Sequence, residues 1–190
     1  MSPDPFTGQS VLIVPGLHGS GPDHWQSRWE RRYPHWRRVE QEDWSVPDIA
    51  AWTERLGVVV LAASQPVLIA AHSFGCLAAA VVAARHPQRI AGILFVAPAN
   101  PAKFGIASKL PQQRFSFPSR VVASDNDPWM PLALARDWAG RWGSALTVLF
   151  GAGHINADSG LGDWSEGLDL LAAIGFEREL AGEEAEGIQE

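Results

Sequence analysis

Cysteine is almost absent from this sequence, since Cys76 is the single cysteine among 190 residues. One cysteine excludes an intramolecular disulfide framework and a metal site built from several cysteines. Long apolar runs are also missing, because the longest reach about half of a membrane span before His, Gly or Pro interrupts them. The opening segment from Met1 to Ser10 is polar and contains proline, unlike a signal peptide. We therefore expect a cytoplasmic protein without a membrane partner.

An excess of positive charge is lacking as well. The formal net charge is −6, which argues against nucleic acid as a partner. Basic residues gather between Arg28 and Arg38, but acidic residues are interleaved with them, as on a solvated helix face. The composition, with 46% hydrophobic and 19% charged residues, is that of a globular protein. We expect residues 1–190 to form a single domain, with its core in residues 10–175 and a fraying acidic tail at 177–190.

Short apolar runs alternate along the chain with stretches of helical periodicity. Strands are predicted at residues 11–14, 36–41, 67–71, 90–97, 121–124 and 146–150. Helices are predicted up to residue 33 from a cap at Asp23, at 49–62 with Asp48 as cap, and at 74–85, 131–142 and 163–174. Fully apolar strands joined by helices indicate a mostly parallel sheet covered on both faces. The predicted fold class is α/β, a three-layer sandwich with about six strands. The irregular segment from Asn100 to Pro118 is long enough for a small lid.

The third predicted strand leads into a sharp turn. The strand is followed at once by His72-Ser73-Phe74-Gly75 and then by an alanine-rich helical run. A serine at such a strand-to-helix turn stands exposed at the sheet edge, as in the nucleophile elbow usually written G-x-S-x-G. Small residues are needed two positions before and after the serine, because its backbone is strained and neighbouring chain passes close by. Gly75 meets this need, and Ala71 stands where the first glycine is usual.

Further chemically useful side chains follow later strands. Asp125 and Asp127 come after the fifth predicted strand, and His154 follows the sixth in a glycine-rich loop. Ligands of open parallel sheets bind beyond the carboxyl ends of the strands, and the order serine, aspartate, histidine is that of α/β-hydrolases. We predict Ser73 as the nucleophile, His154 as its base and Asp127 as the carboxylate behind the base. Asp125 lies nearer the strand end and is expected to bond to backbone in the turn.

Acyl transfer also requires hydrogen-bond donors for the oxyanion. The backbone N–H groups of Phe74, at a helix start, and of Leu17, in the glycine-rich loop after the first strand, are the candidates. The alternative function of that loop, a phosphate cradle, lacks the Lys-Ser/Thr pair of a Walker motif and does not complete G-x-G-x-x-G. His18 and Trp129 lie in loops at the edge of the predicted site, where each either contacts substrate or only packs.

The remaining histidines receive no chemical role. His72 is next to the serine, but a neighbour in a tight elbow normally points away from it, so we predict a packing or orienting role. His24, His35 and His86 lack the spacing of a metal site. Cys76 is expected to be a small buried thiol. We expect neither a metal nor a cofactor.

These motifs together resemble the YdeN-like family of small serine hydrolases, which is related to retinoblastoma-binding protein nine. The matching segments are residues 14–26 (VPGLHGSGPDHWQ), 29–30 (WE), 70–75 (AAHSFG), 97–98 (AP), 124–128 (SDNDP) and 153–156 (GHIN). The resemblance implies an α/β-hydrolase fold with a minimal lid, activity on small esters or amides, and the triad Ser73, Asp127 and His154. It does not imply binding to retinoblastoma protein, because Cys76 does not lie in a Leu-x-Cys-x-Glu segment.

The leading functional hypothesis is a serine hydrolase, of carboxylesterase or acylamide hydrolase type, that works through an acyl-enzyme. The short segment available for a lid favours a small, open pocket and short acyl groups. One competing hypothesis is a binding or scaffold protein that keeps the hydrolase fold without turnover, because function depends on the site and not on the fold. Another is lyase or haloperoxidase-like chemistry on the same three residues, although the sequence contains no residue that distinguishes this chemistry from hydrolysis. The sequence predicts a small-molecule ester or amide as ligand and no particular protein partner.

Overall fold

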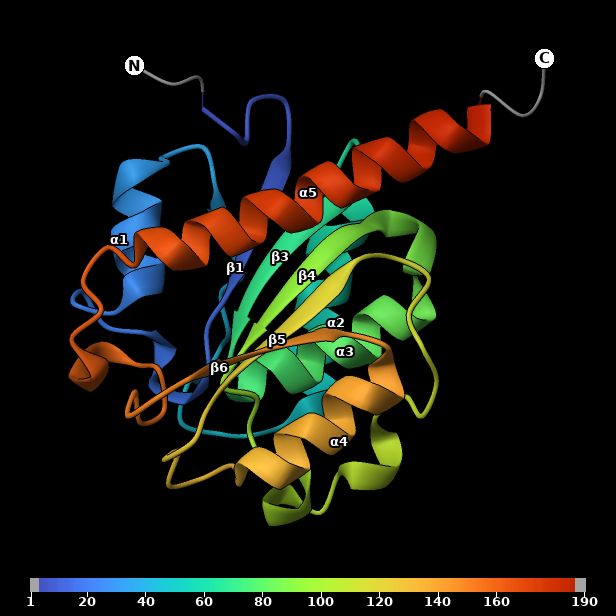
Figure 1. Ribbon diagram of the computed structural model, residues 1–190. Helices are drawn as coiled ribbons and strands as arrows, with labels where there is room; N and C mark the ends of the chain where they lie inside the picture. The colour runs from blue at the N-terminus through green and yellow to red at the C-terminus, as the bar shows by residue number, and fades with distance from the viewer. Residues whose placement is uncertain (1–3, 187–190) are drawn as a thin grey trace.

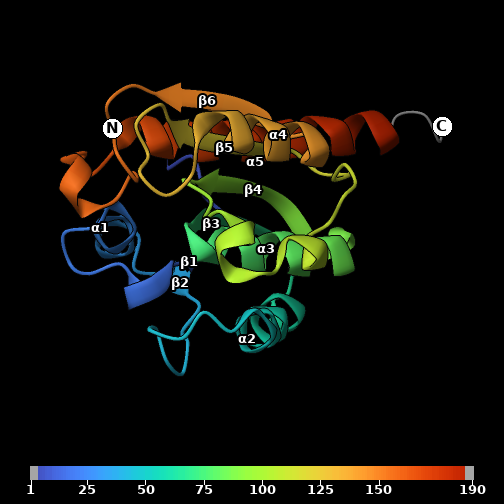
Figure 2. The same ribbon diagram turned by 90° about the horizontal axis from the view of Figure 1, so that it is seen from below.

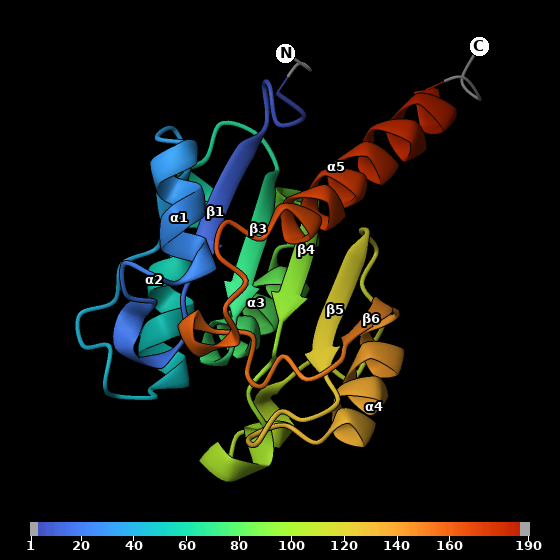
Figure 3. The ribbon, with the colours of Figure 1, turned by 60° about the vertical axis from the view of Figure 1, so that its left-hand side comes forward.

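A parallel β-sheet forms the centre of the protein. The structure, a computed structural model, describes residues 4–186. Within these residues six strands form one sheet in the order β2-β1-β3-β4-β5-β6 (Figure 1). The strands are β1 (Ser10–Val14), β2 (Arg37–Arg38), β3 (Val67–His72), β4 (Ile90–Val96), β5 (Ser119–Ser124) and β6 (Ala145–Leu149). Every neighbouring pair is parallel, so the carboxyl ends of the strands meet at one edge of the sheet (Figure 3).

Helices cover both faces of the sheet. In the described part of the chain they are α1 (Trp25–Arg32), α2 (Ile49–Ala62), α3 (Phe74–Arg85), α4 (Leu132–Trp142) and α5 (Ser165–Glu186). Residues of α1 and α5 share one buried cluster with the sheet, and those of α2, α3 and α4 share the other. Figure 2 shows α1 and α3 on opposite sides of the strands. The predicted three-layer α/β sandwich is therefore confirmed. No helix within residues 4–186 has the length and apolar character needed to cross a bilayer.

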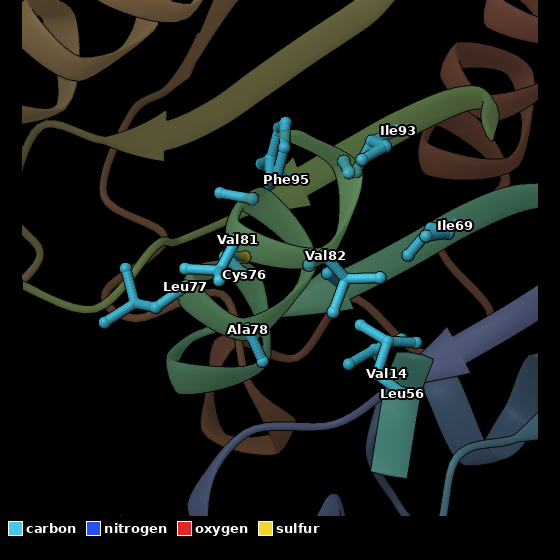
Figure 4. Close-up of a cluster of buried hydrophobic side chains, with 14 of the residues drawn as sticks. Val14, Leu56, Ile69, Cys76, Leu77, Ala78, Val81, Val82, Ile93 and Phe95 are labelled. Carbon is cyan, nitrogen blue, oxygen red and sulfur yellow. The ribbon is translucent and has the colours of Figure 1, made fainter. Parts of the chain in front are cut away.

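The helix that follows the elbow is almost wholly buried. Residues 74–83 of α3 are all buried, and Figure 4 shows its side chains among those of Val14, Leu56, Ile69 and Phe95. The alanines of this helix let its backbone approach the sheet closely, while burial of each larger apolar side chain contributes about 1.5–3 kcal/mol. The start of α3, and with it residue 73, is therefore held on a rigid support.

Tryptophans dominate the core on the other face. The rings of Trp25 and Trp29 from α1 lie 5.1 and 5.8 Å from that of Trp164. Both indole N–H groups donate to carbonyl oxygens of the segment between β6 and α5: Trp25 to Ile155 at 2.9 Å, and Trp29 to Asp163 at 2.7 Å. A buried indole normally needs such a partner. These contacts fasten the loop after β6 to α1.

Three details of the secondary structure differ from the sequence predictions. The predicted strand at 36–41 is only the pair Arg37–Arg38, because β2 is an edge strand with a single neighbour and the ring of Trp36 turns into the aromatic core. The cap of α1 is His24, whose Nδ1 accepts the Gln26 N–H, and not Asp23. The last helix runs to Glu186 instead of ending at residue 174, so residues 177–186 are helical. Residues 187–190 of the predicted fraying tail lie outside the described residues.

The two ends of the described chain lie at the same end of the sheet, but apart from one another (Figures 1 and 3). The chain enters β1 and leaves α5 at the end away from the carboxyl ends of the strands (Figures 1 and 3). The loops that follow β1, β3, β4, β5 and β6 lie at the opposite end. That end carries the predicted site residues.

Candidate active site

Ser73 occupies a strained turn between β3 and α3. Its backbone has φ 53° and ψ −121°, a conformation that non-glycine residues rarely adopt. The turn is held by hydrogen bonds at both ends of the residue. The Ser73 N–H donates to Val96 O at 3.0 Å, and its carbonyl accepts the Cys76 and Ala99 N–H groups at 3.0 and 3.1 Å. Gly75 is required here, because a Cβ would lie 2.3 Å from Pro15 O.

The structure brings Ser73, His154 and Asp127 into one hydrogen-bonded chain. His154 Nε2 lies 2.8 Å from Ser73 Oγ, and His154 Nδ1 lies 2.8 Å from Asp127 Oδ2. A carboxylate can only accept, so the proton of the neutral ring is on Nδ1 and Nε2 accepts from the serine hydroxyl. The side chains of His154 and Asp127 are only 5% and 2% exposed. This arrangement can transfer a proton from the hydroxyl to the imidazole while the carboxylate fixes the ring.

Asp127 is itself fixed by the turn after β5. Its other oxygen, Oδ1, accepts the backbone N–H groups of Trp129 at 2.8 Å and Met130 at 3.2 Å. Asp125 instead accepts the Gly151 N–H at 2.7 Å. The carboxylate that reaches His154 is therefore that of Asp127, and Asp125 bonds to loop backbone.

The loop that carries His154 is anchored to the loop after β5. Besides Asp125, the Ser124 hydroxyl accepts the Ala152 N–H at 3.1 Å, and Asn126 Oδ1 accepts the Gly153 N–H at 2.7 Å. Three successive N–H groups are thus held by three successive side chains. These three bonds fix the distance between Asp127 and His154, although the loop that carries His154 is rich in glycine.

Two backbone N–H groups are free beside the serine. Leu17 and Phe74 are the first residues of their helices, so neither N–H has an acceptor within its helix, and no other bond to them occurs within residues 4–186. Gly16 allows the loop to approach, because a Cβ there would lie 2.7 Å from Ser73 Cβ. The N–H of His18, by contrast, is already donated to Trp44 O at 2.9 Å. Free N–H groups near the serine can stabilise a developing oxyanion.

A pocket of about 460 Å³ opens at Ser73, within the usual size range of ligand sites. Both predicted contact residues line it. His18 is exposed at its edge, and Trp129, which is 50% exposed, places its ring 4.4 Å from that of His154. The segment from residue 100 to 118 supplies one wall through the short 3₁₀ helix Pro101–Phe104. The lining residues are Leu17, His18, Ser20, Gly21, His24, His72, Ser73, Ala99, Asn100, Lys103, Phe104, Trp129, His154, Asn156 and Ala157.

Two histidines without a predicted chemical role, His72 and His24, form a row of neighbouring rings with His154. The rings of His72 and His154 are 5.0 Å apart, and those of His24 and His72 are 4.6 Å apart. His72 Nε2 lies 3.0 Å from the backbone oxygen of His154. Burial lowers the pKa of His72 well below its ordinary value; burial and then the charge of Arg38 lower the pKa of His24 to about 4. Both rings are therefore neutral near pH 7. Their positions in the elbow and in the His24-Trp25-Gln26 segment were the only sequence signals.

Comparison with known proteins identifies the family of this chain. The sequence model of the serine hydrolase family matches residues 11–173. A protein described as a YdeN-like hydrolase, from Pectobacterium atrosepticum, is 40% identical with a TM-score of 0.87, over 91% of this chain and 94% of that one. The ydeN gene product of Bacillus subtilis is 20% identical with a TM-score of 0.72, over 87% and 98% of the two chains.

A more distant structure shares the fold alone. Est1E from Butyrivibrio proteoclasticus, solved with ferulic acid bound, is 13% identical with a TM-score of 0.65, over 88% of this chain and 86% of that one. No curated protein matches the chain. The family match covers most of the sequence and includes Ser73, Asp127 and His154. The chain belongs to the serine hydrolase family.

Proposed function

We propose that this protein hydrolyses small esters or amides through an acyl-enzyme on Ser73. The observation that carries the proposal is the chain of two 2.8 Å hydrogen bonds from Ser73 Oγ through His154 to Asp127. A serine hydroxyl is a poor nucleophile at neutral pH and needs a base within such reach. The elbow places that hydroxyl at the pocket, beside two free N–H groups.

The proposed reaction has two halves. In the first, Ser73 Oγ attacks the substrate carbonyl while His154 Nε2 takes the hydroxyl proton, and the N–H groups of Leu17 and Phe74 stabilise the oxyanion. The intermediate collapses to an acyl-serine as His154 returns the proton to the departing alcohol or amine. In the second half, His154 takes a proton from water, whose oxygen attacks the acyl carbon. Collapse releases the carboxylic acid, and the proton returns to Ser73 Oγ. Asp127 stabilises the imidazolium in both halves.

The pocket supports small substrates of mixed polarity. Apolar contacts are available from Leu17, Phe104 and Trp129, while polar groups surround Ser73. The wall formed by the segment 100–118 is short, so we propose a preference for short acyl groups. Hydrolysis of p-nitrophenyl acetate and p-nitrophenyl decanoate by the same preparation tests this preference. A higher kcat/KM for the decanoate would refute it.

A fluorophosphonate probe distinguishes the proposed enzyme from a binding or scaffold protein that keeps the fold. Such a probe forms a covalent bond only with an activated serine. We expect labelling of the wild-type protein and none of Ser73→Ala. Ser20→Ala is the matched control, because Ser20 also lines the pocket but bonds to the Gln26 side chain at 2.7 Å. Absence of labelling in the wild-type protein would favour the scaffold function.

A further inference from the structure

His72 is an unexpected residue at the end of β3. The other five residues of this strand are apolar, and all six are buried. His72 is only 5% exposed. Burial of a polar group costs free energy unless the group has a hydrogen-bond partner. Its Nε2 lies 3.0 Å from the backbone oxygen of His154. Because a carbonyl oxygen only accepts, the ring donates and its proton is on Nε2.

This bond is a second link between the elbow and His154. His72 contacts the main chain of His154, while its neighbour Ser73 contacts the ring of the same residue at 2.8 Å. The consecutive residues His72 and Ser73 therefore bond to the main chain and to the ring of His154. Such an attachment fixes both the position and the tilt of the imidazole relative to the hydroxyl.

The loop needs an anchor on this side. Gly151 and Gly153 have φ values of 69° and 57°, and Ile155 has a φ of 50°, so the segment is an irregular turn without ladder bonds. Within residues 4–186, the loop after β5 holds the main chain of this segment through the N–H groups of residues 151–153, and Asp127 of the same loop bonds to the His154 ring but not to its main chain. The carbonyl groups of residues 154 and 155 are held from the α1 side, by His72 and by Trp25 respectively.

The groups around His72 keep its ring neutral, so its Nε2 remains an uncharged hydrogen-bond donor. The titratable groups that face the His72 ring are His24 and His154, at ring distances of 4.6 and 5.0 Å. Burial, followed by these two neighbours, lowers the pKa of His72 well below its ordinary value. A neutral His72 adds no positive charge next to the imidazolium that would form on His154.

We propose that His72 is a positioning residue, whose ring N–H holds the main chain of His154 so that the imidazole stays within proton-transfer reach of Ser73. The inference rests on the proposed function, because it assigns His154 the role of base. In this role His72 acts through the main chain of His154 and takes no part in the proton transfer. Its effect is on the geometry of the two residues that carry out that transfer.

The test compares side chains that keep or remove the N–H donor. His72→Phe keeps a ring but removes the donor, and His72→Gln places an amide N–H near the position of Nε2. A misplacement of about 1 Å can cost on the order of 10²-fold in rate. For p-nitrophenyl acetate we therefore expect His72→Phe to lower kcat about 10- to 100-fold with little change in KM. His72→Gln should have a kcat close to that of the wild type. The rate of fluorophosphonate labelling should follow the same order, with His72→Gln faster than His72→Phe.

Trp29→Phe is the control for lost packing, because it also removes a buried ring N–H bond to a loop carbonyl, that of Asp163. It should lower Tm and change kcat much less than His72→Phe does, because Asp163 lies farther along the chain from His154 than the carbonyl that His72 holds. If His72→Phe does not fold, His72→Met and His72→Gln form a second pair of similar length, of which only Gln is a donor. Equal kcat in Met and Gln variants, or a His72→Phe kcat equal to that of Trp29→Phe, would overturn the inference. A wild-type protein without turnover or labelling would instead overturn the proposed function.

Discussion

Protonation of His24 should destabilise the fold below neutral pH. The residue is 4% exposed, and its Nδ1 accepts the Gln26 N–H at the start of α1. Adding a proton to Nδ1 breaks this bond and places a charge in the core near Arg38. Burial and then the Arg38 charge accordingly lower the pKa of His24 from 6.5 to about 4. Between these values the unfolded chain binds the proton more readily, so the free energy of unfolding falls as the pH falls. Each pH unit corresponds to about 1.4 kcal/mol, giving a loss of about 2 kcal/mol by pH 5 and about 3 kcal/mol by pH 4.

Urea unfolding of wild type and His24→Asn between pH 7.5 and about pH 4 measures this loss directly. Asparagine is a good helix cap that accepts the Gln26 N–H and does not titrate. The free energy of unfolding of His24→Asn should therefore decline less across the window, by the amounts given above. His35→Asn, at an exposed histidine, should follow the wild-type curve. Parallel curves for the wild type and His24→Asn would refute the reasoning.

The remaining predictions concern the elbow, the acid and the thiol. Gly75→Ala should lower Tm strongly or prevent folding, because its Cβ would lie 2.3 Å from Pro15 O; Gly57→Ala, with no atom within 4 Å, should leave Tm unchanged or raise it. Asp127→Asn should lower kcat by about 10⁴-fold, and Asp125→Asn, which still accepts the Gly151 N–H, by far less; a similar loss in both would contradict the assignment. Cys76 should resist iodoacetamide until urea is added, because burial raises the pKa of its thiol; rapid alkylation of the native protein would show that it is accessible.

The elements with the strongest patterns were predictable from sequence. α2 and α3 have the predicted bounds, because α2 begins with an aspartate cap and α3 directly follows an apolar strand. The position of Asp127 beside His154 also followed from residue order, since parallel strands deliver the loops after β5 and β6 to the same edge. The proline after Asp127 marked the turn into the next helix, and the glycines before His154 marked where the sixth strand stops.

Other features depend on partners that are distant in sequence. The length of β2 is set by how far the chain stays beside β1, and Trp36 leaves the sheet for a cluster of aromatic rings with Phe6, Trp29 and Tyr33. The cap at His24 requires a neutral imidazole, which burial and the charge of Arg38 favour. The bond from His72 joins residues 82 positions apart, and no local pattern indicates it. α5 continues past residue 174 because the following residues contain no proline and are mostly good helix formers.

The placement of the chain ends has a practical consequence. Since β1 begins and α5 finishes at the end of the sheet opposite to the carboxyl ends of its strands (Figures 1 and 3), a carrier domain or a solid support joined at either side would leave the pocket at Ser73 facing bulk solvent. Substrate delivery to Ser73 would then proceed at the rate seen for the untethered molecule.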